Sequence, residues 1–429
     1  MKSILNLFTI LVLITTLISS CGDDDCSIIC PAGEILTIDC TCVSVGGEET
    51  SENVTSNITS NTTWTSDKNW ILKGRITVES GATLTIQAGT IIKGEAGAEE
   101  NATALIIARG GKIMAEGTRE LPIIFTSVAD QIESGEVQSP NLDKSLNGLW
   151  GGVIILGNAP ISADAASVQI EGIPPSDQNG LYGGTDASDN SGVLRYVSIR
   201  HGGTDIGEGN EINGLTLGGV GSGTVIDFVE VASNVDDGIE FFGGTVNCTN
   251  LLVYNQGDDA FDADQAYAGT VDNFIGIAGS ESDHSLEFDG PEGSGTGTYT
   301  FRNGSLKGWN DAGTGGGEYA DMRDAVTCNI ESCYFFNYSN DSDFELSGDP
   351  ESTNYTNGSI VFADLEFNTS HLTEGNLQVT DIFVDKGTLN AFSANPASAT
   401  IVTTPTVGAD VTVFSSWTLA DAEGLLTGF

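Results

Sequence analysis

The chain has 429 residues, of which 55 are glycine, and its 60 acidic and 15 basic side chains give a formal net charge of −45. This charge excludes binding to the phosphate backbone of nucleic acids and favours cationic partners, above all divalent metal ions. A hydrophobic fraction of 39% excludes a disordered acidic tail, because it is enough to form a large core.

The N-terminal residues are typical of an export signal. Met1 and Lys2 precede an apolar run over residues 4–18, which is too short for a membrane span of ~20 residues but suits a signal peptide. The run ends in Leu17-Ile18-Ser19-Ser20-Cys21, which resembles the lipobox of bacterial lipoproteins, and the acidic residues 23–25 resemble a surface-export signal of Bacteroidota lipoproteins. The resemblance implies a lipid on Cys21 that anchors the protein in the outer membrane, facing the cell exterior. An ordinary cleavage site followed by a disulfide cysteine is the alternative.

The next segment, residues 21–66, is predicted to be a tether. Four cysteines crowd into its first half, namely Cys26, Cys30, Cys40 and Cys42. In an exported chain this spacing predicts two small disulfides, and a metal site of four thiolates is the alternative. Residues 43–66 are rich in Ser, Thr, Asn and Glu without periodicity, which predicts a flexible spacer. The odd number of later cysteines, Cys248, Cys328 and Cys333, predicts at least one buried free thiol.

From about residue 67 the chain repeats. Gly223-Thr224-Val225 recurs as Gly-Thr-Val at 244–246 and 269–271 and as Gly-Thr-Tyr at 297–299. A second pattern of apolar, acidic and apolar residues recurs around Glu240, Asp262, Glu287 and Glu345. Such patterns are typical of strands with one buried face, and repeats of this length are typical of a solenoid. With three strands per repeat, they predict an all-β fold that is a right-handed parallel β-helix.

A β-sandwich or a propeller is the rival fold, but propeller blades need about 40–45 residues and sandwiches lack such a register. Stretches such as 149–157, 195–203 and 236–242 resemble a large Bacteroidota family of exported, pectin-lyase-like β-helix surface proteins, whose members mostly have no assigned activity. The resemblance covers about residues 68–429. We expect the β-helix to span 67–370 and the final coils and a C-terminal cap to span 371–429, after a signal peptide over 1–20.

Stacked acidic residues are the main candidate site. In the predicted register Asp236, Asp258 and Asp283 form one column, and Glu240, Asp262 and Glu287 belong to another. Neighbouring coils lie ~4.8 Å apart, so the carboxylates repel unless a cation lies between them or one keeps its proton. Calcium suits such oxygen-rich sites, and these six residues are its candidate ligands. A solvated acidic face without a metal is the alternative.

The sequence also allows the hypothesis that these acidic segments are catalytic. The segments Asn234-Val235-Asp236-Asp237-Gly238, Gly257-Asp258-Asp259-Ala260 and Asp283-His284-Ser285 resemble the successive motifs of polygalacturonase-like hydrolases. The resemblance implies Asp259 as the acid and Asp237 or Asp258 as the base, about 6.5–9.5 Å apart for inversion. The first motif has an extra residue, and His284 lacks its flanking glycines.

A pectate-type lyase would instead need calcium and a basic residue beside it. Arg323, between two aspartates, is the candidate base, and a salt-bridged surface arginine is the alternative. Together these patterns predict a surface lipoprotein that acts as a rigid acidic binding or structural module with calcium. Its ligand is expected to be a glycan or a partner surface protein, and a polysaccharide-degrading enzyme is the alternative.

Overall fold

The computed structural model describes residues 34–36, 42–44, 50–97, 101–205, 211–310, 317–372 and 377–429. The chain divides into two units, Met1–Glu48 and Glu49–Phe429. In the first unit β1 (Glu34–Leu36) pairs antiparallel with β2 (Cys42–Ser44). The predicted lipid attachment at Cys21 and the cysteines at 26, 30 and 40 lie outside the described residues, and only the backbone of Cys42 is described. None of the described helices is long and apolar enough to cross a membrane.

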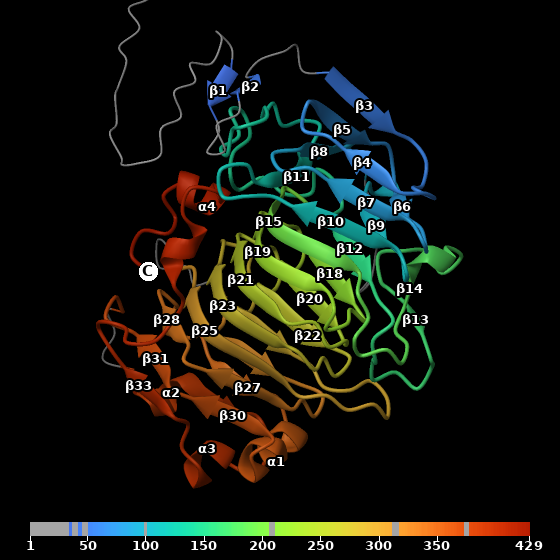
Figure 1. Ribbon diagram of the computed structural model, residues 1–429. Helices are drawn as coiled ribbons and strands as arrows, with labels where there is room; N and C mark the ends of the chain where they lie inside the picture. The colour runs from blue at the N-terminus through green and yellow to red at the C-terminus, as the bar shows by residue number, and fades with distance from the viewer. Residues whose placement is uncertain are drawn as a thin grey trace, which may run out of the picture. The chain divides into compact units, whose positions relative to one another are not determined.

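The second unit is a right-handed parallel β-helix, as the sequence predicted (Figure 1). Its strands form two parallel sheets, and the coils contribute strands to both. We call them the long sheet and the short sheet. The long sheet contains β3 (Thr50–Val54), β4 (Thr62–Trp64), β5 (Lys68–Leu72), β7 (Thr83–Ile86), β8 (Ile91–Gly94), β10 (Lys112–Glu116), β11 (Ile123–Ser127), β15 (Gly192–Arg200), β19 (Val225–Ala232), β21 (Cys248–Tyr254), β23 (Thr270–Ile277), β25 (Tyr299–Lys307), β27 (Cys328–Glu331), β28 (Tyr334–Phe336), β30 (Ile360–Ala363), β31 (Leu365–Asn368) and β33 (Ala399–Ile401). The short sheet contains β6 (Ile76–Val78), β9 (Leu105–Ile107), β12 (Val153–Leu156), β18 (Leu215–Gly218), β20 (Ile239–Phe242), β22 (Phe261–Asp264), β24 (Leu286–Phe288), β26 (Ala320–Met322), β29 (Phe344–Leu346) and β32 (Phe383–Asp385).

Each coil has three strand segments, because the long sheet bends at a corner. β15 pairs with β10 before the corner residue Tyr196 and with β11 after it. Tyr196 has a positive φ of 49°, and Asn250, Asn273 and Asn303 hold the same conformation in later coils. Asparagine tolerates the left-handed region better than most residues, which suits it to this corner.

The core fills the inside of the coils. Inward side chains from both sheets form one continuous apolar cluster. Phenylalanines stack within it, so that Phe261 lies edge-on to Phe274, with ring centroids 5.2 Å apart, and contacts Phe301 at 6.1 Å. Cys248, Cys328 and Cys333 are free and buried, which confirms the prediction of a buried thiol.

Several short strands and helices lie outside the two long parallel stacks of strands. Residues 157–190 leave the helix after β12 and return at β15, and they carry β13 (Val168–Gln169), the 3₁₀ helix η2 (Gln178–Gly180) and β14 (Leu181–Tyr182). A second hairpin joins β16 (Thr204–Asp205) to β17 (Glu211–Ile212). The later elements are the helices α1 (Asp349–Asn357), α2 (Val379–Ile382), α3 (Ala391–Ala394) and α4 (Leu419–Ala422) and the 3₁₀ helix η4 (Val411–Phe414).

The C-terminal tail does not cap the last coil, which corrects the sequence prediction for the residues after about 408. Phe414, Trp417 and Leu419 pack on the outer face of the middle coils, against strands β19, β21 and β23. The buried carboxylate of Glu230 accepts hydrogen bonds from the backbone N–H groups of Leu419 and Ala420, both at 2.9 Å. Figure 1 shows α4 beside these strands. The tail runs back along the solenoid because these strands carry apolar side chains on their outer face.

Candidate functional site

Five acidic side chains stand at the same outward position of successive strands of the short sheet. The parallel register pairs Glu240 with Asp262, Asp262 with Glu287, Glu287 with Asp321, and Asp321 with Glu345. We call these five residues the acid ladder. The structure therefore confirms the predicted stacking and adds Asp321, whose apolar neighbours on both sides carry the same sequence signal.

A second column lies in the turns, two residues before each strand. Asn213, Asp237, Asp259 and His284 hold this place in four successive coils. The Asp237 carboxylate accepts a hydrogen bond from the backbone N–H of Asp259 at 2.9 Å, and the Asp259 carboxylate accepts one from the N–H of His284 at 2.6 Å. These two carboxylates therefore tie one coil to the next.

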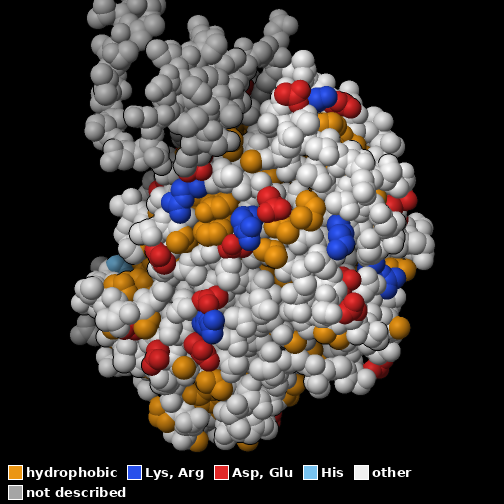
Figure 2. All heavy atoms as spheres, viewed as in Figure 1, with side chains coloured by type: hydrophobic (Ala, Val, Ile, Leu, Met, Phe, Trp, Pro, Cys, Tyr) orange, Lys and Arg blue, Asp and Glu red, His pale blue; other side chains and the backbone are white. Residues whose placement is uncertain are grey.

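Both columns are largely withdrawn from solvent. Glu240 and Asp237 are each 6% exposed, Glu287 is 7% exposed and Asp259 is 1% exposed. A solvated acidic face is therefore wrong for these residues. On the face that Figure 2 shows, by contrast, acidic side chains are scattered and lie beside basic ones.

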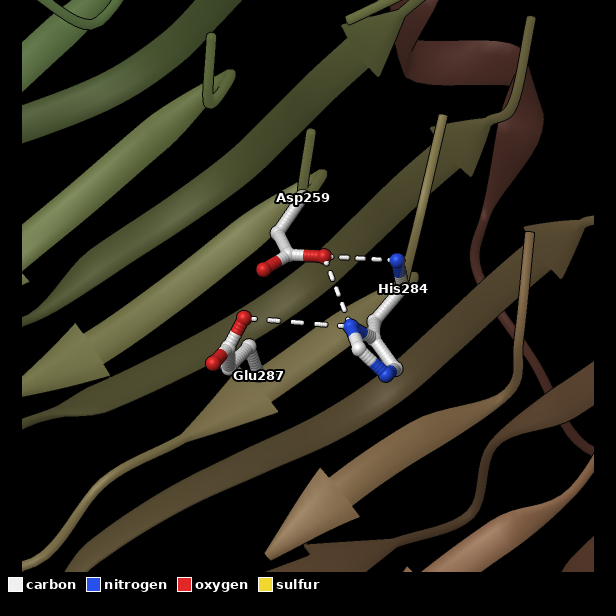
Figure 3. A group of neighbouring side chains, drawn as sticks. All are labelled: Asp259, His284 and Glu287. Carbon is white, nitrogen blue, oxygen red and sulfur yellow. Dashed lines mark hydrogen bonds and ion pairs between the residues drawn. The ribbon is translucent and has the colours of Figure 1, made fainter. Parts of the chain in front are cut away.

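At one end of the site, basic side chains of the protein itself lie against the acids. His284 Nδ1 lies 3.0 Å from Asp259 Oδ1 and 3.8 Å from Glu287 Oε2 (Figure 3). Burial disfavours the charged imidazole, but the hydrogen bond to Asp259 and the charges of Asp259, Asp283 and Asp321 outweigh burial and raise the pKa of His284 to about 9. His284 is therefore a cation at neutral pH.

Two further basic residues continue this neutralisation. The Arg323 guanidinium donates two hydrogen bonds to Asp289, at 2.9 and 2.6 Å, and also pairs with Glu287. Lys386 Nζ lies 2.5 Å from Glu345 Oε2. We call this region the paired end, consisting of Asp259, His284, Glu287, Asp289, Arg323, Glu345 and Lys386. Arg323, the candidate base of a lyase, is therefore held in an ion pair.

The other end of the site has no such partners. We call it the acid-only end, consisting of Asp236, Asp237, Glu240, Asp258 and Asp262. None of the ion pairs in the described part of the chain includes any of these five side chains. One carboxylate oxygen from each of Asp236, Asp237 and Asp258 lies within 4.8 Å of the others, and Asp237, Glu240 and Asp262 form a second such group. Among the residues that the structure describes, none donates a hydrogen bond to the buried Oδ1 of Asp262.

The same crowding shifts the pKa values of the acid-only end. Burial, followed by the charges of neighbouring acids, raises the pKa of Asp236 to about 8 and that of Asp258 to about 6. The same two causes, in the same order, hold the pKa values of Asp237, Glu240 and Asp262 well above their ordinary range. Protons or an external cation must therefore offset the repulsion here.

Two residues of this region escaped the sequence prediction. Glu171, from the 157–190 segment, lies against Glu240, and the Asn213 amide donates to both carboxylates, with 3.0 Å to Glu171 Oε1. The place of Asn213 two residues before a strand was readable from the repeat. Glu171 carried no signal, because its segment has no repeat.

The six predicted calcium ligands fall into two groups. Asp236, Glu240, Asp258 and Asp262 belong to the acid-only end. Asp283 and Glu287 do not, because Asp283 lies 3.7 Å from His284 Nδ1 and Glu287 pairs with Arg323.

The structure brings the catalytic candidates together, and it holds two of them in a hydrogen-bonded pair. Asp259, the candidate acid, is almost fully buried, and its Oδ1 accepts hydrogen bonds from His284. The candidate bases Asp237 and Asp258 place carboxylate oxygens within 4.8 Å of each other, and only Asp258 is exposed. His284 holds a structural ion pair with Asp259.

The sequence of this protein matches one family model. The model describes a pectate-lyase-like β-helix domain and covers residues 56–418. The chain belongs to the pectate-lyase-like β-helix family. Neither the curated proteins nor the solved structures gave a match. Membership of this family supports a polysaccharide-related or binding module and agrees with the parallel coils of the structure.

Proposed function

We propose that this protein is a rigid binding module of the cell surface that holds a calcium ion at its acid-only end. The observation that carries the proposal is a group of five adjacent carboxylates, none of which forms an ion pair in the described part of the chain. Calcium is a hard cation that takes six to eight oxygen ligands at 2.3–2.6 Å, and it bridges carboxylates readily. The donor set fits it, because every candidate ligand atom is a carboxylate oxygen.

A glycan is the ligand that this arrangement supports best. Asp258 is exposed, so a cation near it keeps positions open to solvent that sugar hydroxyl or carboxylate oxygens can fill. The rigid coils fix the spacing of the ligands. In this proposal the lipid on Cys21 anchors the module in the outer membrane, and the acidic surface repels nucleic acids. A partner surface protein is the other candidate ligand.

A polysaccharide-degrading enzyme remains the second candidate function, since the three motifs around Asp237, Asp259 and His284 do stack on successive coils. The hydrogen bonds that these side chains make favour a structural role over proton transfer. The binding module is therefore the better-supported function.

Melting curves and product assays on the same samples test this choice. The purified protein is melted in calcium chloride and in EGTA, beside assays for reducing ends and unsaturated uronides on acidic polysaccharides. We expect a calcium-dependent rise in Tm without products. Product release that disappears in Asp259→Asn, with no effect of calcium on Tm, would establish the enzyme instead.

A further inference from the structure

The start of the 157–190 segment crosses the coils that carry the acids. We call its residues 159–163 the axial tie, because they run from coil to coil along the ends of the short-sheet strands. Its backbone hydrogen bonds to the chain beyond β18, β20, β22 and β24 are Ala159 N–H to Gly219 O (2.8 Å), Gly244 N–H to Pro160 O (2.9 Å), Ser162 N–H to Gln265 O (3.1 Å) and Gly295 N–H to Ser162 O (3.1 Å). Three extended residues span about 10 Å, as do two coil spacings of ~4.8 Å, so the tie advances in step with the coils.

Gln265 fixes the axial tie to the middle of the acid site. Its side chain is 2% exposed, and its Oε1 accepts hydrogen bonds from the Oγ of Ser162 and the N–H of Ala163, both at 3.0 Å. Ser162 is fully buried, and its Oγ accepts a hydrogen bond from the N–H of Glu292 at 3.1 Å. Gln265 follows β22 directly, three residues after Asp262. The tie is therefore attached to a coil that carries an acid of the acid-only end.

The loop after β24 closes over the axial tie. A Cβ at Gly293 would lie 2.5 Å from the carbonyl oxygen of Ser162, and a Cβ at Gly295 would lie 2.6 Å from the Cα of Ser162. Non-bonded atoms do not approach so closely, so both positions need glycine for the loop to pass the tie. Between them, the N–H of Ser294 donates to the carboxylate of Asp164 at 3.0 Å. Loop and tie are therefore fitted to each other at consecutive residues.

The axial tie spans the coils whose acids repel one another. Asp237, Glu240 and Asp262 come from neighbouring coils, and one carboxylate oxygen of each lies within 4.8 Å of the others. Repulsion between charges that are stacked along the solenoid pushes neighbouring coils apart. A segment that bonds to several of these coils opposes that displacement. Its contacts should therefore contribute more to stability when the acids are ionised.

We propose that the axial tie, fixed by Gln265 and Ser162, holds the acid-bearing coils together against the repulsion of their carboxylates and so sets the spacing of the acid-only end. The inference deepens the proposed function, and it rests on that function for the cation that the spacing serves. Gln265 and Ser162 are positioning residues, because they act through the coils and do not touch the cation. Docking of the tie and binding of the cation then favour each other reciprocally.

Hydrogen–deuterium exchange of the whole protein in EGTA at pH 8 tests the tie without calcium. Gln265→Met is made in the wild type and in a neutral background. The neutral background carries Asp237→Asn, Glu240→Gln and Asp262→Asn. The amides of Ala159 and Ser162 are the reporters, because their acceptors are backbone carbonyls that the substitution leaves in place. We expect Gln265→Met to speed their exchange about tenfold in the wild type and about threefold or less in the neutral background.

A second variant and a control make this comparison specific. Ser162→Ala removes a hydroxyl that donates to Gln265, and its effect should depend on the acids in the same way. Asn354→Leu is the matched control, since the Asn354 amide donates to the carbonyls of Ala325 and Val326 at 2.8 and 2.9 Å and joins α1 to a coil outside the acid-only end. It should act equally in both backgrounds. Equal factors for Gln265→Met in the two backgrounds would overturn the proposal, whether or not calcium raises Tm.

Calorimetric titration with calcium chloride separates the inference from the function on which it rests. If the tie sets the spacing of the acids, Gln265→Met should weaken calcium binding by about threefold or more. Equal calcium affinity of Gln265→Met and the wild type would overturn the control of spacing and leave the binding module in place. If exchange depends on the acids as expected but the wild type binds no calcium, the calcium site is wrong and the tie stands.

Discussion

The two ends of the acid site differ in how the repulsion between stacked carboxylates is offset. At the paired end, His284, Arg323 and Lys386 lie against the acids that the coils stack together. At the acid-only end, which adjoins it in the neighbouring coils of the same sheet, none of the five carboxylates forms an ion pair within the described part of the chain. Both ends stand on the same parallel sheet, and they differ in the side chains that surround the acids.

This contrast indicates which end serves the fold and which can take a ligand. A cation that belongs to the chain is always present, and the interactions that it makes are part of the folded state. An exchangeable cation makes the state of the site depend on its concentration, by RT ln(1 + [L]/Kd). The acid-only end is therefore the part of the site where binding can change the behaviour of the protein.

Removing the charges of the acid-only end should have the largest effect. The triple variant Asp237→Asn, Glu240→Gln and Asp262→Asn is expected to melt higher than the wild type in EGTA, because the repulsion is gone. Calcium at 100 times its Kd should stabilise the wild type by about 2.7 kcal/mol and the variant by almost nothing. Scanning calorimetry in calcium and in EGTA measures both effects.

The matched control for that variant changes three acids elsewhere, namely Glu52, Glu95 and Glu116 to Gln. Each lies in a salt bridge on the long sheet or beside it. The control has the same net charge as the triple variant and should keep the full response to calcium. A triple variant that responds to calcium like the wild type would show that the ion binds elsewhere.

The pH dependence should differ between the ends. In EGTA the folded acid-only end keeps protons up to the pKa of Asp258, about 6, and of Asp236, about 8, while unfolded aspartates lose theirs near 3.9. The folded state binds more protons in this window, so stability should fall as pH rises from about 4 to 8. Calcium should remove most of this fall.

His284 gives the internal comparison for the pH experiment. Its folded pKa of about 9 exceeds the unfolded value near 6.5, so its contribution is complete below 6.5 and is lost as pH rises to about 9. Calcium should leave this second fall unchanged, and His284→Gln should remove it. Melting temperatures from pH 4 to 9.5 would contradict the comparison if calcium flattened both windows equally.

The repeat made the fold and the ladder predictable from the sequence. Each coil repeats an apolar, acidic and apolar strand, so that the register of Glu240, Asp262 and Glu287 follows from counting residues. Repetition of this kind turns a three-dimensional arrangement into a one-dimensional one. The predicted signal peptide, lipid anchor and calcium ligand set stay predictions.

The neutralising partners could not be predicted in the same way. Lys386 comes from the end of β32 and meets Glu345 only because the last coil stacks there, and Glu171 reaches the ladder from a segment without repeat. The tail was misplaced for a similar reason. Its apolar residues indicated burial, but the outward apolar side chains that receive Trp417 looked like ordinary strand residues.

Within the paired end, Arg323 should matter most. Arg323→Met leaves the nearly buried Glu287 and Asp289 without their shared cation. Loss of one partner of a buried pair costs about 3–5 kcal/mol, and we expect about 1–2 kcal/mol here because the Arg323 side chain is 42% exposed. Arg302→Met is the matched control, since Arg302 pairs with Asp272 on the long sheet and should cost less than about 1 kcal/mol. Urea unfolding that finds equal costs for both variants would contradict the distinction.

Lys386 should have the smallest effect, because its side chain is 51% exposed and it contacts the last member of the ladder. Lys386→Met is expected to cost at most about 0.5–1 kcal/mol in urea unfolding, as is typical of exposed ion pairs. The loss should disappear at high salt, since screening weakens an exposed pair more than the nearly buried contacts of Arg323. A cost for Lys386→Met that equals the cost for Arg323→Met and persists in salt would mean that the ladder is neutralised collectively. The paired end would then have to be treated as one charge network rather than as separate local pairs.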